Sequence, residues 1–109
     1  MFLTYQDEIT LHAIRKFIDS NLQPRMKIAE LVKKFGMKES KLTKGFKQLF
    51  GTSIYNYFLK SSMQHARIML VQGVPTKVVA ITLGYSKTSS FSRAFQKVHG
   101  ILPGSISMR

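Results

Sequence analysis

An internal repeat limits what this chain can fold into. Two stretches share one pattern of apolar residues around a glycine: Leu31, Val32, Gly36, Met37, Leu42, Phe46 and Gly51 in the first copy, and Val79, Ala80, Gly84, Tyr85, Phe91, Phe95 and Gly100 in the second. Val32 and Ala80 lie 48 positions apart, whereas Leu42 and Phe91 lie 49 apart, so the second copy has one extra residue in its turn. Apolar residues that recur every three or four positions indicate helices, and each copy therefore predicts a helix, a tight turn and a second helix.

The same spacing predicts helices along the rest of the chain. They are expected over residues 7–21, 27–34, 39–50, 53–72, 76–83 and 88–99, with a short helix or turn between Pro103 and Arg109. Gln23-Pro24-Arg25 ends the first of them, and Gly36 and Gly84 supply the left-handed residue of each tight turn. We therefore expect an all-α, homeodomain-like fold of about seven helices, in which two helix-turn-helix subdomains are joined by a long linker helix. The expected boundaries are residues 1–52 for the first subdomain, 53–73 for the linker helix and 74–109 for the second subdomain.

Residues at the helical spacing are expected to form the core. They are Leu11, Ile14, Phe17, Ile18, Ile28, Leu31, Val32, Phe35, Leu42, Phe46, Leu49, Ile54, Phe58, Met63, Ala66, Met69, Leu70, Phe91, Phe95 and Val98. Phe46, Phe91 and Phe95 could alternatively stack on nucleic-acid bases, but their regular spacing favours burial.

The chain carries a formal net charge of +12, and this charge is unevenly distributed. All five acidic residues lie in the first 39 residues, and the rest of the chain contains ten Lys or Arg and no acid. A field of this kind attracts polyanions, of which nucleic acid is the commonest in cells, although a merely solubilising surface is the alternative. Four of the acids, Asp7, Glu8, Glu30 and Glu39, fall near expected helix starts, where the helix dipole favours negative charge, and Asp19 has no such role.

The residue types that are absent exclude several classes of protein. The chain has no cysteine, which excludes disulfides and thiolate metal sites. No apolar segment approaches the roughly 20 residues that span a bilayer, and the first residues do not resemble a signal peptide, so a soluble, cytoplasmic protein is expected. His12, His65 and His99 lack the i, i+4 spacing of a helical metal site. No catalytic grouping of Ser, His and acid, and no pair of carboxylates, can be assembled, so we expect neither an enzyme nor a cofactor.

The second helix of each repeat carries polar and basic residues opposite its apolar anchors. Such a helix can enter the major groove of DNA, where Lys and Arg contact phosphates and Ser, Thr and Arg read base edges. The candidate DNA-binding residues are Lys38, Ser40, Lys41, Thr43, Lys44 and Lys47 in the first copy, and Lys87, Ser89, Ser90, Arg93 and Lys97 in the second. The linker helix, roughly 30 Å long, is comparable with the roughly 34 Å between successive major-groove faces.

The second copy also resembles a known family. Residues 81–97, with Gly84-Tyr85, Phe91-Ser92-Arg93 and Phe95, are similar to the signature of the AraC/XylS family of bacterial transcription regulators, and the resemblance covers nearly the whole chain. It implies an AraC-type DNA-binding domain whose two recognition helices, over residues 39–50 and 88–99, occupy adjacent major-groove segments of double-stranded DNA. The base-reading residues that it implies are Ser40, Thr43, Lys44, Ser89, Ser90 and Arg93. It also implies RNA polymerase as a partner and a separate effector-binding or dimerisation domain that is absent from this chain.

The chain departs from the pattern of this family at several positions. Lys38 stands where a capping Ser is usual, which weakens the cap but brings a positive charge close to a phosphate. Gly45 replaces a larger apolar residue, at a helix-interior cost of about 1 kcal/mol relative to Ala. Ser62 replaces an Arg in the linker helix, and Ile106-Ser107 replaces Tyr-Arg.

The resulting hypothesis is sequence-specific binding to double-stranded DNA that regulates transcription. One alternative is a nucleic-acid-binding module that is held by charge without sequence preference. Another is a protein-interaction module for an acidic partner, which predicts no DNA binding. Because the outward residues of the two copies differ, the hypothesis predicts an asymmetric DNA site that is read by one chain.

Overall fold

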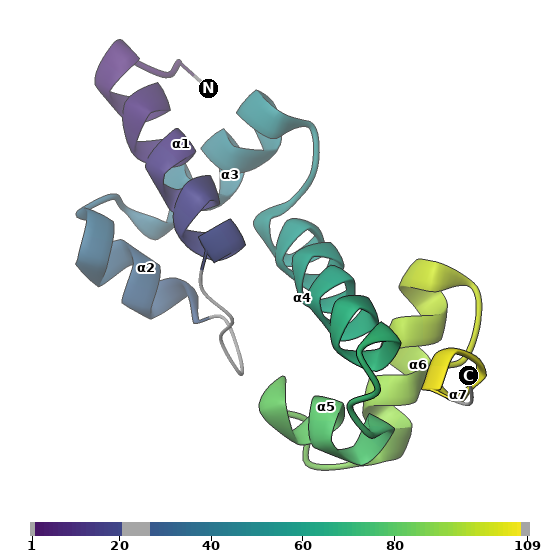
Figure 1. The fold of residues 1–109 in the computed structure, drawn as a ribbon. Helices are drawn as coiled ribbons and strands as arrows, with labels where there is room; N and C mark the ends of the chain where they lie inside the picture. The colour runs from purple at the N-terminus through teal and green to yellow at the C-terminus, as the bar shows by residue number, and fades with distance from the viewer. Residues whose placement is uncertain (1, 21–26, 108–109) are drawn as a thin grey trace. The chain divides into compact units, whose positions relative to one another are not determined.

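The computed structural model describes residues 2–20 and 27–107, and every regular element within these residues is an α-helix (Figure 1). The helices are α1 (Tyr5–Ser20), α2 (Ile28–Phe35), α3 (Glu39–Phe50), α4 (Ile54–Val71), α5 (Thr76–Thr82), α6 (Thr88–His99) and α7 (Gly104–Ser107). The expected all-α fold is confirmed, and α3 and α6 begin and end where the repeat predicts them. The predicted end of the first helix at Asn21, the predicted break at residues 23–25 and the chain end at Arg109 lie outside the described residues.

Other helix ends differ from the prediction by one or two residues. The first helix starts at Tyr5 because Thr4 caps it: Thr4 Oγ1 accepts a hydrogen bond from the Asp7 N–H at 3.0 Å, and Asp7 Oδ2 accepts one from the Thr4 N–H at 2.9 Å. This reciprocal pair is a capping box. Ser53 precedes α4 and caps it through its Oγ, which accepts a hydrogen bond from the Asn56 N–H at 3.1 Å. Apolar spacing carries no information about these polar caps, so it misses the helix ends by a residue or two.

The described residues form two compact units, and the division between them falls inside α4. The N-terminal unit comprises residues 2–20 and 27–58, and the C-terminal unit comprises residues 59–107. Each unit contains one helix pair of the repeat, α2 with α3 or α5 with α6. Each unit also has a hydrophobic core of its own. The sequence repeat is therefore a repeat of compact units.

In the N-terminal unit, α1, α2 and α3 pack on one another. The buried cluster consists of Leu11, Ile14, Ile18, Ile28, Leu31, Met37, Leu42, Phe46 and Ile54. The ring of Phe46 is fully buried and meets Phe50 and Tyr57 edge-on, at 4.6 and 5.6 Å between ring centroids. Phe46 is thus a core residue, as predicted. The predicted core residues that are only partly buried and pack against this cluster are Phe17, Val32, Phe35, Leu49 and Phe58.

Close packing between α3 and the N-terminal part of the chain depends on Gly45. A Cβ atom at this buried position would lie 3.1 Å from Leu11 Cδ1 and 3.1 Å from Leu3 Cδ2. Both distances are shorter than the roughly 3.5–4.0 Å of an optimal carbon–carbon contact, so a larger residue would force these side chains to move. The glycine that departs from the family pattern therefore has a packing role here, which offsets part of its helix-propensity cost.

In the C-terminal unit, α4 packs with α5, α6 and α7. The buried cluster consists of Met63, Ala66, Leu70, Val79, Ala80, Leu83, Phe91, Phe95 and Ile106, and the predicted Met69 and Val98 are partly buried against it. Phe91 and Phe95 are fully buried, which confirms that they are core residues. The short helix α7 contributes Ile106, which the spacing argument left out of the core. His99 of α6 packs against Phe95 with the two rings tilted, and it donates its Nε2 hydrogen to the carbonyl oxygen of Met63 at 2.9 Å, which connects α6 to α4.

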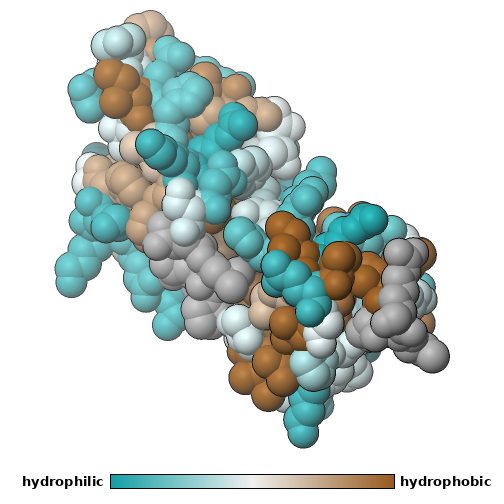
Figure 2. Space-filling model, viewed as in Figure 1, coloured by the Kyte–Doolittle hydropathy of each residue, from teal (hydrophilic) through white to brown (hydrophobic). Residues whose placement is uncertain are grey.

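The exposed apolar side chains gather on the C-terminal unit in the view of Figure 2, whereas the visible face of the N-terminal unit is mostly polar. The exposed apolar residues of the C-terminal unit that lie on α4 and α5 are Ile68, Val71, Val78 and Ile81. Within the described part of the chain, no helix is both long and apolar enough to cross a membrane.

Candidate nucleic-acid interface

The helix α3 separates polar and apolar residues onto opposite faces. Each residue advances the helix by about 100°, so Ser40, Lys44 and Lys47 fall on one face, and all three are exposed. Leu42 and Phe46 fall on the opposite face and are fully buried. The exposed face therefore offers a hydroxyl group and two ammonium groups to a ligand.

A tight turn fixes the direction of α3 relative to α2. Gly36 adopts a left-handed φ of 67°, and its N–H donates a hydrogen bond to the Val32 carbonyl at 2.8 Å. L-residues with a side chain are disfavoured at this φ, so the predicted role of Gly36 is confirmed. Met37 then buries its side chain. Lys38 is exposed at the N-cap of α3 and makes no side-chain capping hydrogen bond.

The second turn is longer and is built differently. Gly84 has a φ of 85° and donates its N–H to the Ile81 carbonyl at 2.9 Å, while the Tyr85 N–H donates to the Ala80 carbonyl at 2.9 Å. This pair of hydrogen bonds is a Schellman motif, whereas the first turn uses the single bond of an αL motif. Five residues separate α5 from α6 and three separate α2 from α3. The longer second turn expected from the repeat is therefore present.

The helix α6 presents a face that corresponds to that of α3. Ser89, Arg93 and Lys97 are exposed, and Ser90 is partly buried. Lys87 is exposed at the N-cap and, like its counterpart in the first copy, makes no side-chain capping hydrogen bond. The apolar anchors of α6 lie in the core of the C-terminal unit. The predicted residues of this copy are thus brought together on one helix.

Thr43 is partly buried and bonds to its own helix. Its hydroxyl donates to the Glu39 carbonyl at 3.0 Å and also lies 3.3 Å from the Ser40 carbonyl. The hydroxyl hydrogen is therefore used within α3, and the oxygen lone pairs remain available as acceptors.

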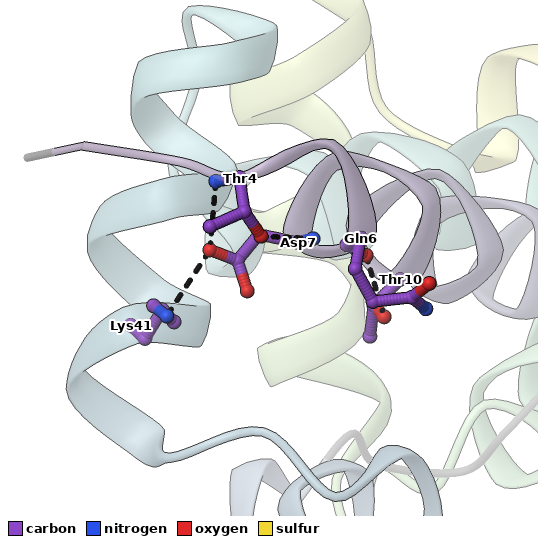
Figure 3. Close-up of polar contacts among 5 residues, drawn as sticks. All are labelled: Thr4, Gln6, Asp7, Thr10 and Lys41. Atoms are coloured by element: carbon purple, nitrogen blue, oxygen red, sulfur yellow. Dashed lines mark hydrogen bonds and ion pairs between the residues drawn. The ribbon is translucent and has the colours of Figure 1, made fainter.

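Lys41 contacts α1. Its Nζ lies 3.1 Å from Oδ2 of Asp7, and Figure 3 shows it reaching toward the carboxylate in the capping box of α1. The hydrogen bond from the Thr4 N–H, followed by that from Lys41, holds the pKa of Asp7 below its ordinary value of 3.8. Asp7 is therefore ionised at neutral pH, and the contact is a salt bridge. Nothing in the sequence spacing indicated this pairing.

The other lysines at this helix are Lys38 at its N-cap and Lys44 and Lys47 within it. In the part of the chain that the structure describes, none of the three makes an ion pair. The C-terminal unit contains no acidic residue within residues 59–107. Positive charge therefore stays uncompensated on both candidate helices, as binding to a polyanion requires.

Asp19 has a structural partner that the sequence did not reveal. The Tyr57 hydroxyl donates to Asp19 Oδ1 at 2.6 Å, and the guanidinium group of Arg15 lies over the rings of Phe50 and Tyr57, at 5.0 and 5.6 Å from their centroids. Burial, and then the hydrogen bond to Asp19, raises the pKa of Tyr57 above its ordinary value of 10.0. This cluster joins the C-terminal part of α1 to the first turn of α4.

Two of the three histidines, His12 and His99, make structural contacts. The ring of His12 meets Phe50 edge-on at 5.1 Å between centroids, and His99 bonds to Met63 as described above. Among residues 2–20 and 27–107, no group of three or more His, Cys, Asp or Glu could hold a metal ion. The chemistry that these helices offer is hydrogen bonding and positive charge.

Solved structures share this fold. The C-terminal domain of AraT, a response regulator from Geobacillus stearothermophilus, matches with a TM-score of 0.83 at 23% sequence identity, over 91% of this chain and 84% of that chain. A transcriptional regulator from Chromobacterium violaceum, of the AraC-type DNA-binding domain-containing proteins, matches with a TM-score of 0.81 at 20% identity, over 96% of this chain and 95% of that chain. The fold that this chain shares with them is a double helix-turn-helix domain.

The family follows from the sequence match. Residues 31–109 match the family model described as a helix-turn-helix domain, and the chain belongs to this family in its AraC-type form. The probable transcriptional regulator LumQ from Photobacterium leiognathi is 28% identical over 98 residues, which are 89% of this chain and 40% of LumQ. The chain thus spans less than half the length of this relative. The chain is a sequence-specific DNA-binding domain of the kind that regulates transcription. Domains of this kind are not a class of enzyme.

Proposed function

We propose that α3 and α6 are the two recognition helices of this chain and that they occupy adjacent major-groove segments of one double-stranded DNA site. The proposal rests on one arrangement that occurs in both units. Each unit presents an amphipathic helix after a tight glycine turn, with its apolar face buried and its polar face exposed. The major groove, about 12 Å wide, admits a helix of this kind.

The proposed base contacts lie in the first half of each helix. They are Ser40, Thr43 and Lys44 in α3, and Ser89, Ser90 and Arg93 in α6. A guanidinium group can donate two hydrogen bonds to O6 and N7 of a guanine, so Arg93 has the side chain best suited to discriminate between bases. Serine hydroxyls both donate and accept, and the free lone pairs of the Thr43 hydroxyl can accept.

The proposed phosphate contacts lie at the ends of the same faces and are Lys38, Lys47, Lys87 and Lys97. Both recognition helices have a lysine at the N-cap and no side-chain cap. Lysine has no acceptor, so it forgoes the roughly 1 kcal/mol that a capping Ser, Thr, Asp or Asn contributes. Lys27 stands in the same way at the N-cap of α2, so this feature is not special to the recognition helices, but at α3 and α6 a phosphate oxygen can satisfy the free amides and the ammonium group together. Lys41 is not in this set because its ammonium group is paired with Asp7.

The two faces differ in chemistry, which supports an asymmetric DNA site. The face of α3 combines hydroxyls with ammonium groups, whereas that of α6 combines two serines and one ammonium group with the guanidinium group of Arg93. Different donors select different bases, so we propose two unlike half-sites that are read by a single chain.

We further propose that the complete protein acts in the bacterial cytoplasm, contacts RNA polymerase, and carries an additional effector-binding or dimerisation domain. The length of LumQ supports the last point, because the match covers only 40% of that relative. For the chain itself we propose binding without catalysis.

Selection of bound sites from a random duplex library tests the proposal. The expected result is one asymmetric motif with two conserved segments, whose binding survives moderate salt and falls by about 1–3 kcal/mol for each mismatched base pair. Enrichment without a motif, with affinity that falls uniformly as salt rises, would instead establish a binder held by charge alone. No enrichment would contradict DNA binding, which is the result that the protein-interaction alternative predicts.

A further inference from the structure

The flank of α3 that faces α1 carries a lysine. At about 100° per residue, Lys41 lies about 100° from Ser40 around the helix, and Gly45 lies about 40° further on. Gly45 is the position at which a Cβ atom would lie 3.1 Å from Leu11 Cδ1 of α1. Lys41 and Gly45 therefore share the flank of α3 that packs on α1, and not the exposed row that contains Ser40.

The carboxylate that Lys41 meets is held in place by α1. Asp7 Oδ2 accepts the hydrogen bond from the Thr4 N–H at 2.9 Å and lies 3.1 Å from Lys41 Nζ (Figure 3). The side chain of Asp7 is 13% exposed and that of Lys41 is 41% exposed. A salt bridge loses side-chain entropy when both partners are mobile, so a carboxylate fixed by a capping box favours the pair.

We infer that Asp7 is a positioning residue for DNA binding, which keeps the ammonium group of Lys41 on the α1 side of α3 and away from the DNA phosphates. The inference rests on the proposed role of α3 as a recognition helix. Lys41 is then a contact between helices, although its place directly after Ser40 would suggest a DNA contact.

The salt dependence of DNA affinity distinguishes the two roles. A lysine that neutralises a phosphate releases a counterion and adds about 0.9 to the slope of log affinity against log salt. A lysine already neutralised by Asp7 adds nothing. Removing the charge of Asp7 should free Lys41 to reach a phosphate, so the slope should become steeper.

The experiment compares four proteins on one duplex obtained by site selection, between 50 and 200 mM salt: the unmodified chain, Asp7→Asn, the double variant Asp7→Asn with Lys41→Met, and Lys47→Met. Asparagine can still accept the hydrogen bond from the Thr4 N–H, so Asp7→Asn removes mainly the charge. Lys47 is the matched control, because it is an exposed lysine on the proposed DNA face of the same helix. Thermal melts establish that each variant is folded.

The inference predicts that Asp7→Asn loses about 3.5-fold more affinity than the unmodified chain over this fourfold salt range, because one more phosphate contact is made. The double variant should return to the unmodified slope, and Lys47→Met should lose about 3.5-fold less. If Asp7→Asn does not fold, the slope of Lys41→Met, which keeps the capping box, is compared with that of the unmodified chain. An equal slope supports the inference, because Lys41 then makes no phosphate contact, and a shallower slope overturns it.

An unchanged slope in Asp7→Asn, with a shallower slope in the double variant or in Lys41→Met, would show that Lys41 already contacts DNA and would overturn the inference. Failure of the proposed function is a different result. It would be seen in the unmodified chain, as equal affinity for the selected and a scrambled duplex, or in Lys47→Met, as an unaltered slope.

Discussion

Replacing Phe95 by alanine should strongly destabilise the C-terminal unit. Phe95 is fully buried, with its ring centroid 4.5 Å from that of His99 and 5.8 Å from that of Phe91. Deleting such a ring costs about 3–5 kcal/mol, because transfer free energy is lost and a cavity remains. Natural domains have about 0.05–0.15 kcal/mol of stability per residue, so a chain of 109 residues has about 5–16 kcal/mol in total. The substitution therefore removes a large share of the stability.

The thermal midpoint, followed by far-ultraviolet circular dichroism, should fall by at least about 12 °C, since 1 kcal/mol corresponds to about 4–8 °C in a domain of this size. Phe95→Leu is the control. It conserves most of the volume, should cost less than about 1.5 kcal/mol and should keep DNA affinity. An unchanged midpoint in the alanine variant, combined with lost DNA affinity in the leucine variant, would show that Phe95 is not a core residue. It would mean instead that the ring stacks on bases.

Three further changes test particular residues. Arg93→Ala should weaken binding to the selected duplex by about 1–3 kcal/mol and relax the preference at one base pair, as measured by fluorescence anisotropy on a panel of single-base variants; equal affinities across the panel would exclude Arg93 from base reading. Gly36→Ala should lower stability to chemical denaturation by about 1–2 kcal/mol, because φ is 67° while a Cβ there would meet nothing within 4 Å; an unaltered midpoint would mean that the turn is not fixed at this φ. The lowered pKa of Asp7 means that its charge stabilises the fold at neutral pH and that this contribution is lost as pH falls through that lowered pKa. Melts of Asp7→Asn and the unmodified chain should therefore differ at neutral pH and converge in acid, and a constant difference would contradict the salt bridge.

The two proposed recognition helices, α3 and α6, were predictable because local signals define them. Apolar residues at helical spacing specify the buried face, and Gly51 and Gly100 end α3 and α6 with a hydrogen bond from each glycine N–H to a carbonyl in the last turn. The turn glycines Gly36 and Gly84 follow from the same repeat. These signals lie within a few residues of one another, so sequence alone contains them.

The long-range contacts of the N-terminal unit depend on how its helices pack. Asp19 and Tyr57 are 38 positions apart, and no periodicity connects them. The sequence places Asp7 at a helix start, which is correct, but its salt bridge with Lys41 requires α1 to lie beside α3. From the sequence, Gly45 only lowers the helix propensity of α3, whereas in the structure Leu11 lies so close that a larger residue would force it to move. Long-range packing, which local spacing does not encode, decides these contacts.

Methylation interference on the selected duplex tests the central claim, that one chain reads DNA with both α3 and α6. Methylation of guanine N7 blocks contacts in the major groove, so it reports where each recognition helix lies. Two unlike windows of interference are expected, with centres about 10–10.5 base pairs apart, and one of them should disappear in Arg93→Ala. A single window, or two windows that both persist in that variant, would contradict the claim.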